Sequence, residues 1–386
     1  MHRVPRTGPH APFTESLRDR SIFVTGHTGF KGSWLSLWLH ELGARVTGYA
    51  LDPPTEPNNF EASRIASLLA GDHRADIRDT GALKRALDES QPDVVLHLAA
   101  RTVVRESFTD PVETVSANVM GTVTLLEAIR LRAQPCVVVV VSSDKCYAND
   151  ESGKPFGEDD PLGGDDPYSA SKSAVELVTQ AYRRSFFPPD QLGRHGVAVA
   201  TTRAGNVVGG GDWTPDGLVA DVMRNLGIGQ RVPIRYPSAV RPWQHVLEPL
   251  AGYLMLASRL LERHGAARFC SAWNFGPDDA NYETVGQVVE RMVTAWRSGG
   301  WDRRTNASDP PEATMLRLSS ARAAAELGWR SRWGIGEVIE RTVEWYRRYA
   351  ADPSSARAAC LADIEAYTRA LEGRPARAPV LATAAV

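Results

Sequence analysis

Two short motifs in the chain contain side chains suited to proton transfer. In the run Tyr168-Ser-Ala-Ser-Lys172 the Tyr and the Lys are four residues apart, a spacing that places both on one face of a helix. An ammonium group beside a phenol lowers the pKa of the phenol and makes it a usable base near neutral pH. The pair is therefore suited to taking the proton of an alcohol during its oxidation.

The second motif, Ser143-Asp144-Lys145, follows the apolar run of residues 136–141. At the carboxyl end of a strand these side chains provide a hydroxyl donor, an acid and a possible second base. Hydride transfer alone needs no such extra acid and base, so the two motifs together predict an oxidation followed by a second proton-transfer reaction. The alternative is an ordinary solvated turn at the end of a strand.

A glycine-rich loop near the N-terminus predicts a dinucleotide site. The run of residues 26–32, Gly-His-Thr-Gly-Phe-Lys-Gly, follows a predicted strand and opens a predicted helix. Its backbone can therefore approach a pyrophosphate at the positive end of that helix, and the alternative is a plain glycine turn. The cofactor contacts expected in this loop are Gly26, Thr28, Gly29, Phe30, Lys31 and Gly32.

The remaining cofactor contacts are expected at the ends of the next strands. A ribose-binding acid is usual about 20 residues beyond the glycine loop, but Ala50 occupies that position and Asp52 follows two residues later. Asp52 either takes the ribose role from a shifted loop or is simply solvated. Asp76 and Ile77 are placed to meet the adenine edge. Leu98, Ala99 and Ala100 are expected on the nicotinamide side.

Apolar strands alternate with amphipathic helices over the first two thirds of the chain. The predicted strands are residues 21–25, 45–49, 74–77, 93–98, 136–141 and 197–202, and the predicted helices are residues 30–42, 80–90, 111–132 and 168–186. Such alternation is typical of a parallel sheet covered on both faces. The expected fold class is α/β, a Rossmann-type doubly wound parallel sheet with a smaller α+β C-terminal substrate lobe.

The pattern becomes irregular after about residue 205. Helices are predicted at residues 218–226, 247–263, 284–297 and 335–350, and a short strand at residues 272–275. We expect an NAD-binding Rossmann domain over residues 21–205, with some later segments returning to it, and a mainly substrate-binding lobe over residues 206–350. Residues 1–20 are expected to form a loosely ordered extension, and residues 351–386 a C-terminal helix and tail.

The composition is that of an ordinary globular protein, with 43% hydrophobic and 23% charged residues. The formal net charge of −2 gives no reason to expect a nucleic-acid partner. No apolar stretch approaches the ~20 residues that span a bilayer, and residues 1–20 contain no apolar signal segment, so no membrane partner is expected. The four Cys lack metal-ligand spacing, which predicts reduced thiols, no metal site and a cytoplasmic location.

Together these motifs resemble those of the extended short-chain dehydrogenase/reductase family and, within it, of the CDP-glucose 4,6-dehydratases. The resemblance is carried by residues 24–34, 144–147, 203–213 and 241–248, and it covers roughly residues 21–346. The glycine loop and the Tyr168/Lys172 pair identify only the superfamily. Lys145, where dTDP-glucose dehydratases carry Glu, and the run Arg-Pro-Trp-Gln-His-Val-Leu-Glu over residues 241–248 are more specific.

The resemblance implies a mechanism with tightly bound NAD that is regenerated each cycle. Tyr168 takes the proton of the sugar 4-hydroxyl while C4 gives hydride to NAD, Lys172 holds the cofactor ribose, and Ser143 hydrogen-bonds the 4-oxygen. Lys145, or a group near it, then removes the C5 proton, and Asp144 protonates the departing 6-hydroxyl before hydride returns to C6. Lys145 can act as a base only if its pKa falls, and Asp144 as an acid only if its pKa rises.

The resemblance also implies binding roles outside these motifs. Asn118 would order the site from its helix and count among the cofactor-binding residues, and the sugar nucleotide would be held by Arg101, Arg105, Asn206, Trp213, Arg235 and Arg241. Arginines are candidates because a guanidinium fork matches phosphate oxygens. A homodimer is expected through a four-helix bundle formed by residues 111–132 and 168–186. The apolar faces of these helices, which include Val119, Val123, Leu126, Leu177 and Ala181, would also fit burial against the sheet.

Several alternatives stay open at the level of the sequence. The chain departs from the family pattern at residues 101–104 and 216–218, which leaves room for a different base or sugar. An epimerase, or a dehydratase with another regiochemistry, would use the same scaffold. A non-catalytic dinucleotide-sensing protein is a further possibility, but such proteins typically lack the Tyr/Lys pair.

Overall fold

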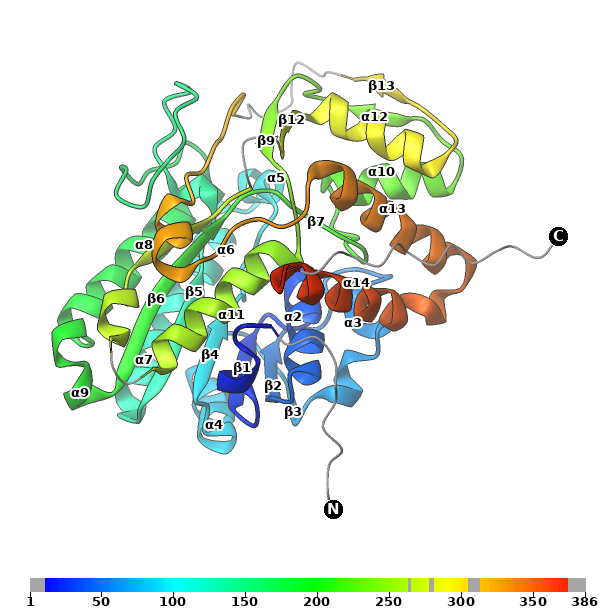
Figure 1. Ribbon diagram of the computed structural model, residues 1–386. Helices are drawn as coiled ribbons and strands as arrows, with labels where there is room; N and C mark the ends of the chain where they lie inside the picture. The colour runs from blue at the N-terminus through cyan, green and yellow to red at the C-terminus, as the bar shows by residue number, and fades with distance from the viewer. Residues whose placement is uncertain (1–10, 263–264, 278–280, 305–312, 374–386) are drawn as a thin grey trace.

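A seven-stranded parallel sheet forms the centre of the molecule (Figure 1). The computed structural model describes residues 11–262, 265–277, 281–304 and 313–373. In spatial order the strands are β3 (Gly71–Arg74), β2 (Arg45–Ala50), β1 (Ser21–Thr25), β4 (Val94–His97), β5 (Cys136–Val141), β6 (Val197–Ala204) and β11 (Ala272–Phe275). The order reverses between β1 and β4, where ligands bind in open α/β sheets. The predicted α/β fold class is confirmed.

Helices cover both faces of this sheet because its strands are apolar on both sides. Along β5, Val137 and Val139 belong to one core cluster and Val138 and Val140 to the other, as the alternation of side chains in a strand requires. One face is covered by α4 (Thr80–Ser90), α7 (Gly121–Arg132) and α8 (Pro167–Ser185), and the other by α2 (Phe30–Glu41), α11 (Leu247–Leu261) and α14 (Ala356–Leu371).

Three predicted elements differ from the structure. The third strand was expected at residues 74–77 but is β3, Gly71–Arg74, an edge strand with half-buried and exposed residues in alternation. Ile77 lies beyond its end and packs against Gly121 of α7. The predicted helix of residues 111–132 is α6 (Pro111–Val115), a π-helical stretch η2 (Ser116–Met120) and α7. The strand at residues 272–275 is confirmed, but it joins the main sheet beside β6.

The segment before the first strand is more ordered than expected. Helix α1 (Thr14–Leu17) buries Leu17 completely, and the ring of Phe13 packs edge-on against Trp38 at 5.5 Å between centroids. Apolar side chains at residues 11–17 therefore belong to the core, so the expectation of a loose extension is wrong for this part. The remainder of the predicted extension and tail, residues 1–10 and 374–386, lies outside the described residues.

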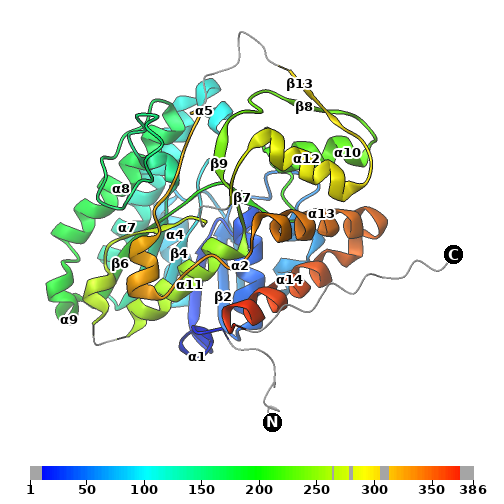
Figure 2. The same ribbon diagram turned by 45° about the horizontal axis from the view of Figure 1, so that its top comes forward.

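A smaller group of elements lies beyond α13 (Ile335–Ala351), as Figures 1 and 2 show from two sides. It contains the strand pairs β8 (Val232–Ile234) with β13 (Trp301–Arg303) and β9 (Val240–Pro242) with β12 (Tyr282–Thr284), and the helices α10 (Leu218–Gly227) and α12 (Val285–Trp296). The strand pair β7 (Val207–Val208) and β10 (Gln244–His245) connects this smaller group to the sheet. Three further short helices are α3 (Asn59–Ala62), α5 (Val104–Thr109) and α9 (Leu192–His195). Within the described ranges, every helix is too short or too polar to cross a bilayer.

The C-terminal helix α14 is fastened to the core by a buried carboxyl group. Tyr367 of α14 donates its hydroxyl to Glu248 Oε2 at 2.5 Å, and the backbone N–H groups of Arg332 and Trp333 donate to the same carboxyl. Burial raises the pKa of Glu248 to about 7, although these hydrogen bonds oppose the shift. These contacts give Glu248 a structural role.

Replacing Glu248→Gln should flatten the pH dependence of stability. Because the folded state raises the pKa of Glu248 from 4.5 to about 7, folding takes up a proton between those values. This contribution to stability is fully present below pH 4.5 and is lost as pH rises through 7, by about 3 kcal/mol in total. Denaturant unfolding at pH 5 and pH 8 measures it: the difference should shrink in the variant, and an unchanged difference would contradict the assignment.

Candidate active site

The carboxyl end of β5 positions the Ser143-Asp144-Lys145 motif in a buried turn. Asp144 begins the short 3-10 helix η3 (Asp144–Cys146), and the Ser143 hydroxyl caps this helix by accepting the Lys145 N–H at 3.2 Å. The carbonyl of Cys146 accepts a hydrogen bond from Ser173 of α8 at 2.8 Å. The motif is therefore tied to the helix that carries Tyr168 and Lys172, and it is not a solvated turn.

Ser143 connects the predicted acid with the predicted base. Its hydroxyl donates to Asp144 Oδ1 at 3.0 Å and is also hydrogen-bonded with the Tyr168 phenol. All three side chains are buried. Three residues from the two sequence motifs thus share one hydrogen-bonded cluster.

The environment of the Asp144 carboxyl group bears directly on its predicted role as an acid. Burial raises the pKa of its carboxyl group, and the charges of Lys145 and Arg241 only partly oppose this. The second carboxyl oxygen, Oδ2, is buried and has no hydrogen-bond partner among the described residues. The pKa of Asp144 is therefore shifted in the direction that the predicted role as an acid requires.

Tyr168 and Lys172 are both buried on α8, and this burial affects the pKa values of both side chains. Burial raises the pKa of the Tyr168 phenol, with the hydrogen bond from Ser143 acting in the opposite direction. The Lys172 ammonium donates to the carbonyl of Val141 at 3.3 Å. Burial, and next the charge of Lys31, lower the pKa of Lys172 to about 8. The expected lowering of the Tyr168 pKa is not seen, because burial dominates.

Lys31 enters the site in a way that the sequence did not indicate. It was predicted to contact a cofactor from the glycine loop, yet its side chain reaches the same cluster from the first turn of α2. Burial lowers the pKa of Lys31 to about 8, and the charge of Asp144 opposes the shift. The sequence did contain one signal for this position: Lys31 is a charged residue in the otherwise mostly apolar and buried helix α2.

The glycine loop between β1 and α2 is shaped by close backbone contacts. Gly26 has φ +75°, and a Cβ on it would lie 2.7 Å from the Ala99 nitrogen. A Cβ on Gly32 would lie 2.1 Å from the Gly26 carbonyl oxygen. Gly29 is the N-cap of α2, and the Thr28 hydroxyl donates to the Leu51 carbonyl. This cradle fits a pyrophosphate at a helix N-terminus, with residues 98–100 against its side.

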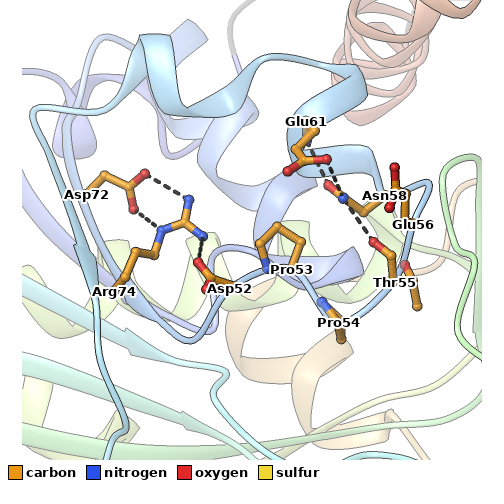
Figure 3. A pocket seen from close by; sticks show the side chains of 9 residues that line it. All are labelled: Asp52, Pro53, Pro54, Thr55, Glu56, Asn58, Glu61, Asp72 and Arg74. Carbon is orange, nitrogen blue, oxygen red and sulfur yellow. Dashed lines mark hydrogen bonds and ion pairs between the residues drawn. The ribbon is translucent and has the colours of Figure 1, made fainter.

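Asp52 lines a cavity of about 640 Å³ at the carboxyl ends of β2 and β3 (Figure 3). Arg74 lies between Asp72 and Asp52. It donates two hydrogen bonds to Asp72, at 2.8 and 2.9 Å, and one to Asp52 at 3.4 Å. Asp72 also bonds His27 of the glycine loop at 2.8 Å. The Asp52 side chain is 88% exposed. Ribose binding by Asp52 stays a prediction, and the cavity that Asp52 lines lies where the adenosine ribose would be expected.

The other predicted cofactor residues lie at the same edge of the sheet. The carboxylate of Asp76 forms an ion pair with Arg78 at 2.6 Å. Ile77 is buried beside α7. Asn118, in the π-helical stretch η2, accepts the Arg101 N–H at 2.8 Å and donates to Ser171 of α8 at 2.8 Å. Asn118 therefore connects the loop after β4 to the helix of Tyr168. π-Helical bulges of this kind are frequent at functional sites.

Two of the predicted phosphate-binding arginines converge on one carboxylate. Arg105 of α5 and Arg235, which follows β8, each lie 3.1 Å from Asp216 Oδ1. Arg241 is buried and close enough to Asp144 for its charge to act on that carboxyl. The structure thus brings Arg241 close to Asp144 and places Arg105 and Arg235 together at Asp216.

The last three predicted substrate residues have structural partners. The half-buried Asn206 follows β6, and its carbonyl accepts the Gln244 N–H at 3.1 Å. Trp213 packs against Trp345 and Tyr349, with the ring of Tyr349 4.9 Å away. The Arg101 guanidinium pairs with Glu106 at 3.2 Å. These contacts do not test the predicted roles.

Comparison with known proteins identifies the family. The model of the GDP-mannose 4,6 dehydratase family matches residues 23–342. The chain belongs to this family. It is 48% identical over 332 residues to the CDP-glucose 4,6-dehydratase of Salmonella typhimurium (strain LT2), covering 86% of this chain and 92% of that protein. To UDP-glucose 4-epimerase 2 of Oryza sativa subsp. japonica it is 27% identical, covering 84% of this chain and 81% of the other.

Solved structures agree with this family membership. The chain superposes with a TM-score of 0.72 on the dTDP-glucose 4,6-dehydratase of Streptomyces venezuelae, solved with NAD and TYD bound. The two are 25% identical, and the match covers 86% of this chain and 99% of the other. The dehydratase fold is therefore matched over most of the described residues.

Adding a methyl group at Gly32 should disrupt the glycine loop of this dehydratase-family chain. Gly32→Ala would force a Cβ against the Gly26 carbonyl, and we expect a loss of at least about 2 kcal/mol in unfolding free energy. Gly29→Ala is the matched control because its Cβ would lie 3.4 Å from the same oxygen, with a cost near about 1 kcal/mol. Chemical denaturation measures both, and equal losses would contradict the close contact at Gly32.

Proposed function

We propose that this chain is an NAD-dependent sugar-nucleotide 4,6-dehydratase that converts CDP-D-glucose to CDP-4-keto-6-deoxy-D-glucose. The observation that carries the proposal is the buried Asp144, whose raised pKa and free oxygen suit an acid, beside the Tyr168–Ser143 pair. The 48% identity to a protein named CDP-glucose 4,6-dehydratase supports the choice of reaction and nucleotide. An alcohol oxidation alone would not need this acid.

The first half of the proposed reaction is oxidation at C4. Bound NAD supplies the acceptor for the C4 hydride and later the donor of the same hydride to C6. Tyr168 takes the proton of the 4-hydroxyl, and Ser143, which already lies between Tyr168 and Asp144, hydrogen-bonds the 4-oxygen. Lys172, one helical turn after Tyr168, is proposed to hold the ribose of the cofactor.

The second half is elimination of water. The 4-ketone acidifies the C5 proton, which Lys145 removes, and Asp144 gives its proton to the 6-hydroxyl as the C6–O bond breaks. The hydride then returns to C6 and a proton returns to C5, so the net change is the loss of one water. The half-buried Lys145 is adjacent in sequence to Asp144, so acid and base act on neighbouring carbons from one turn.

The glycine cradle and the cavity beside Asp52 support NAD as the cofactor. Gly26, Gly29 and Gly32 would hold the pyrophosphate, and Asp52 the adenosine ribose. We propose that residues 21–205 serve mainly the cofactor and residues 206–350 mainly the substrate. Because a guanidinium fork matches phosphate oxygens, Arg105, Arg235 and Arg241 are proposed to hold the diphosphate.

The alternatives from the sequence have less support. An epimerase would need no acid at Asp144, and the identity to a plant UDP-glucose 4-epimerase is only 27%. A different sugar nucleotide stays the second candidate because Arg105 and Arg235 meet at Asp216, inside a segment that departs from the family pattern.

A panel of sugar nucleotides tests the proposed function. The purified protein, incubated with CDP-glucose, dTDP-glucose, UDP-glucose and GDP-mannose, should yield a product lighter by one water from CDP-glucose alone, as read by mass spectrometry. Conversion of another nucleotide in preference would correct the substrate. An isomer of unchanged mass would contradict a dehydratase.

A second copy of this chain is the proposed partner. Apolar side chains on α6, η2, α7 and α8 are exposed, among them Val112 at 79%, Met120 at 50% and Leu177 at 54%. Figures 1 and 2 show α7 and α8 side by side at one outer edge of the molecule. Two such pairs would form the expected four-helix bundle. Leu126, expected on this face, is instead buried against the sheet.

Leu177→Glu should break the proposed homodimer. A charge in the centre of an apolar interface is costly to bury, so analytical ultracentrifugation should show the wild type as a dimer and the variant as a monomer. Ile228→Glu is the control, because Ile228 is 67% exposed at the end of α10, away from α8. A monomeric wild type, or a dimeric Leu177 variant, would contradict the interface.

The cytoplasm is the proposed location. The four cysteines are free and buried, and unpaired thiols are typical of reducing compartments.

A further inference from the structure

A buried charged network lies behind the Asp144–Lys145 turn, outside the residues assigned to the reaction. Arg203 of β6 pairs with Glu176 of α8 at 2.9 Å, and their side chains are only 4% and 3% exposed. The Thr201 hydroxyl donates to the same Glu176 oxygen at 2.7 Å. The network therefore joins the sheet to the helix that carries Tyr168 and Lys172.

Tyr147 extends this network to the catalytic turn. Its hydroxyl accepts a hydrogen bond from Arg203 Nη1 at 2.7 Å and donates to Asn274 Oδ1 of β11 at 2.7 Å. Its ring stacks on Phe156 at 4.9 Å between centroids, and the Arg203 guanidinium lies 4.9 Å from the ring. The position of Tyr147 is fixed through both its hydroxyl and its ring.

The network touches both elements that carry catalytic side chains. Tyr147 is the C-cap of η3, which contains Asp144 and Lys145. Glu176 lies four residues after Lys172 on α8. Movement at Tyr147 would therefore be passed directly to the proposed acid and base.

Stability gives no sufficient reason for such an arrangement. A buried ion pair costs desolvation, and an apolar set of similar volume is often as stable or more so. Among the residues that the structure describes, Arg203 Nε and Glu176 Oε1 also lack hydrogen-bond partners, so the network is not fully satisfied. What it supplies is directed hydrogen bonds that define one geometry for Tyr147.

We propose that Tyr147, Arg203 and Glu176 are positioning residues for the elimination step, which hold the Asp144–Lys145 turn in place relative to C5 and C6 of the sugar. The inference rests on the proposed function, which assigns that step to Asp144 and Lys145. Displacement of a catalytic group by about 1 Å can cost on the order of 100-fold in rate.

The oxidation step should depend less on this network. The Tyr168 N–H donates to the Ser107 hydroxyl at 3.2 Å, and Asn118 bonds Ser171 in the same helical turn. The Lys172 ammonium bonds the end of β5. Tyr168 and Lys172 thus have anchors of their own that do not pass through Tyr147.

Tyr147→Phe removes one oxygen and keeps the stacked ring. In single-turnover experiments with CDP-glucose, we expect C4 oxidation, followed by NADH absorbance, to stay within about twofold of wild type. Formation of the 4-keto-6-deoxy product should fall about tenfold or more, so that the NADH signal accumulates, with KM unchanged. If Tyr147→Phe fails to fold, Arg203→Lys replaces it, because this variant keeps a positive charge opposite Glu176 but loses the guanidinium that also bonds Tyr147. It should likewise slow product formation while leaving C4 oxidation nearly unchanged.

Tyr182→Phe is the matched control, because the Tyr182 hydroxyl lies on the same helix α8 and donates to Glu127 at 3.3 Å, far from the turn. It should change neither step. An equal fall in both steps for the Tyr147 variant, or no fall in either, would overturn the positioning role.

Asp144→Asn separates this inference from the proposed function. If that variant eliminates water as fast as wild type, the assignment of the acid fails. If it does not eliminate, while Tyr147→Phe behaves as wild type, only the positioning role fails.

Discussion

Burial of a single carboxyl group sets the chemistry that this site can perform. Asp144 is 3% exposed at the end of β5, where a carboxylate loses most of the stabilisation that water provides. The charges of Lys145, Arg241 and Lys31 reduce the cost of ionisation without removing it. Burial thus moves the pKa of Asp144 toward that of a proton donor, and the proposed acid beside a Tyr and a Ser would distinguish this site from one built only for hydride transfer.

The parallel sheet explains why these groups meet. β1 and β5 flank β4, so the glycine loop after β1 and the catalytic turn after β5 open at the same edge of the sheet. Lys31 spans this distance, since it belongs to the first turn of α2 yet acts electrostatically on both Asp144 and Lys172. The proposed cofactor loop and the proposed acid–base residues are thus electrostatically connected in one buried region.

The sequence predicted most of what depends on local pattern. Apolar runs identified six of the seven strands of the main sheet, although β11 was expected in the smaller lobe. The seventh, β3, was misplaced because a polar edge strand gives little periodic signal. The catalytic motifs and the glycine loop were identifiable because neighbouring residues carry them. Their mutual geometry was less predictable: the 3.3 Å bond from Lys172 to Val141 and the raised pKa of Tyr168 both arise from burial in the folded chain.

Contacts between distant residues were out of reach for the same reason. Tyr147 and Asn274 are 127 residues apart, and Arg203 and Glu176 are 27 apart. Both Tyr147 and Arg203 lie in runs that the sequence had singled out, but no spacing indicated that they bond each other. Substrate identity is the other weak point, because Arg105, Asp216 and Arg235 come from three separate segments that only folding assembles.

In the proposed reaction, one buried site oxidises C4 and then reduces C6 with the same hydride. An isotope crossover experiment tests this most directly. Equal amounts of CDP-glucose carrying deuterium at C4 and of CDP-glucose labelled only with carbon-13 are converted together, and the product is read by mass spectrometry and NMR. We expect deuterium at C6 of the carbon-12 product alone. Deuterium retained at C4, or found in the carbon-13 product, would contradict the proposed reaction.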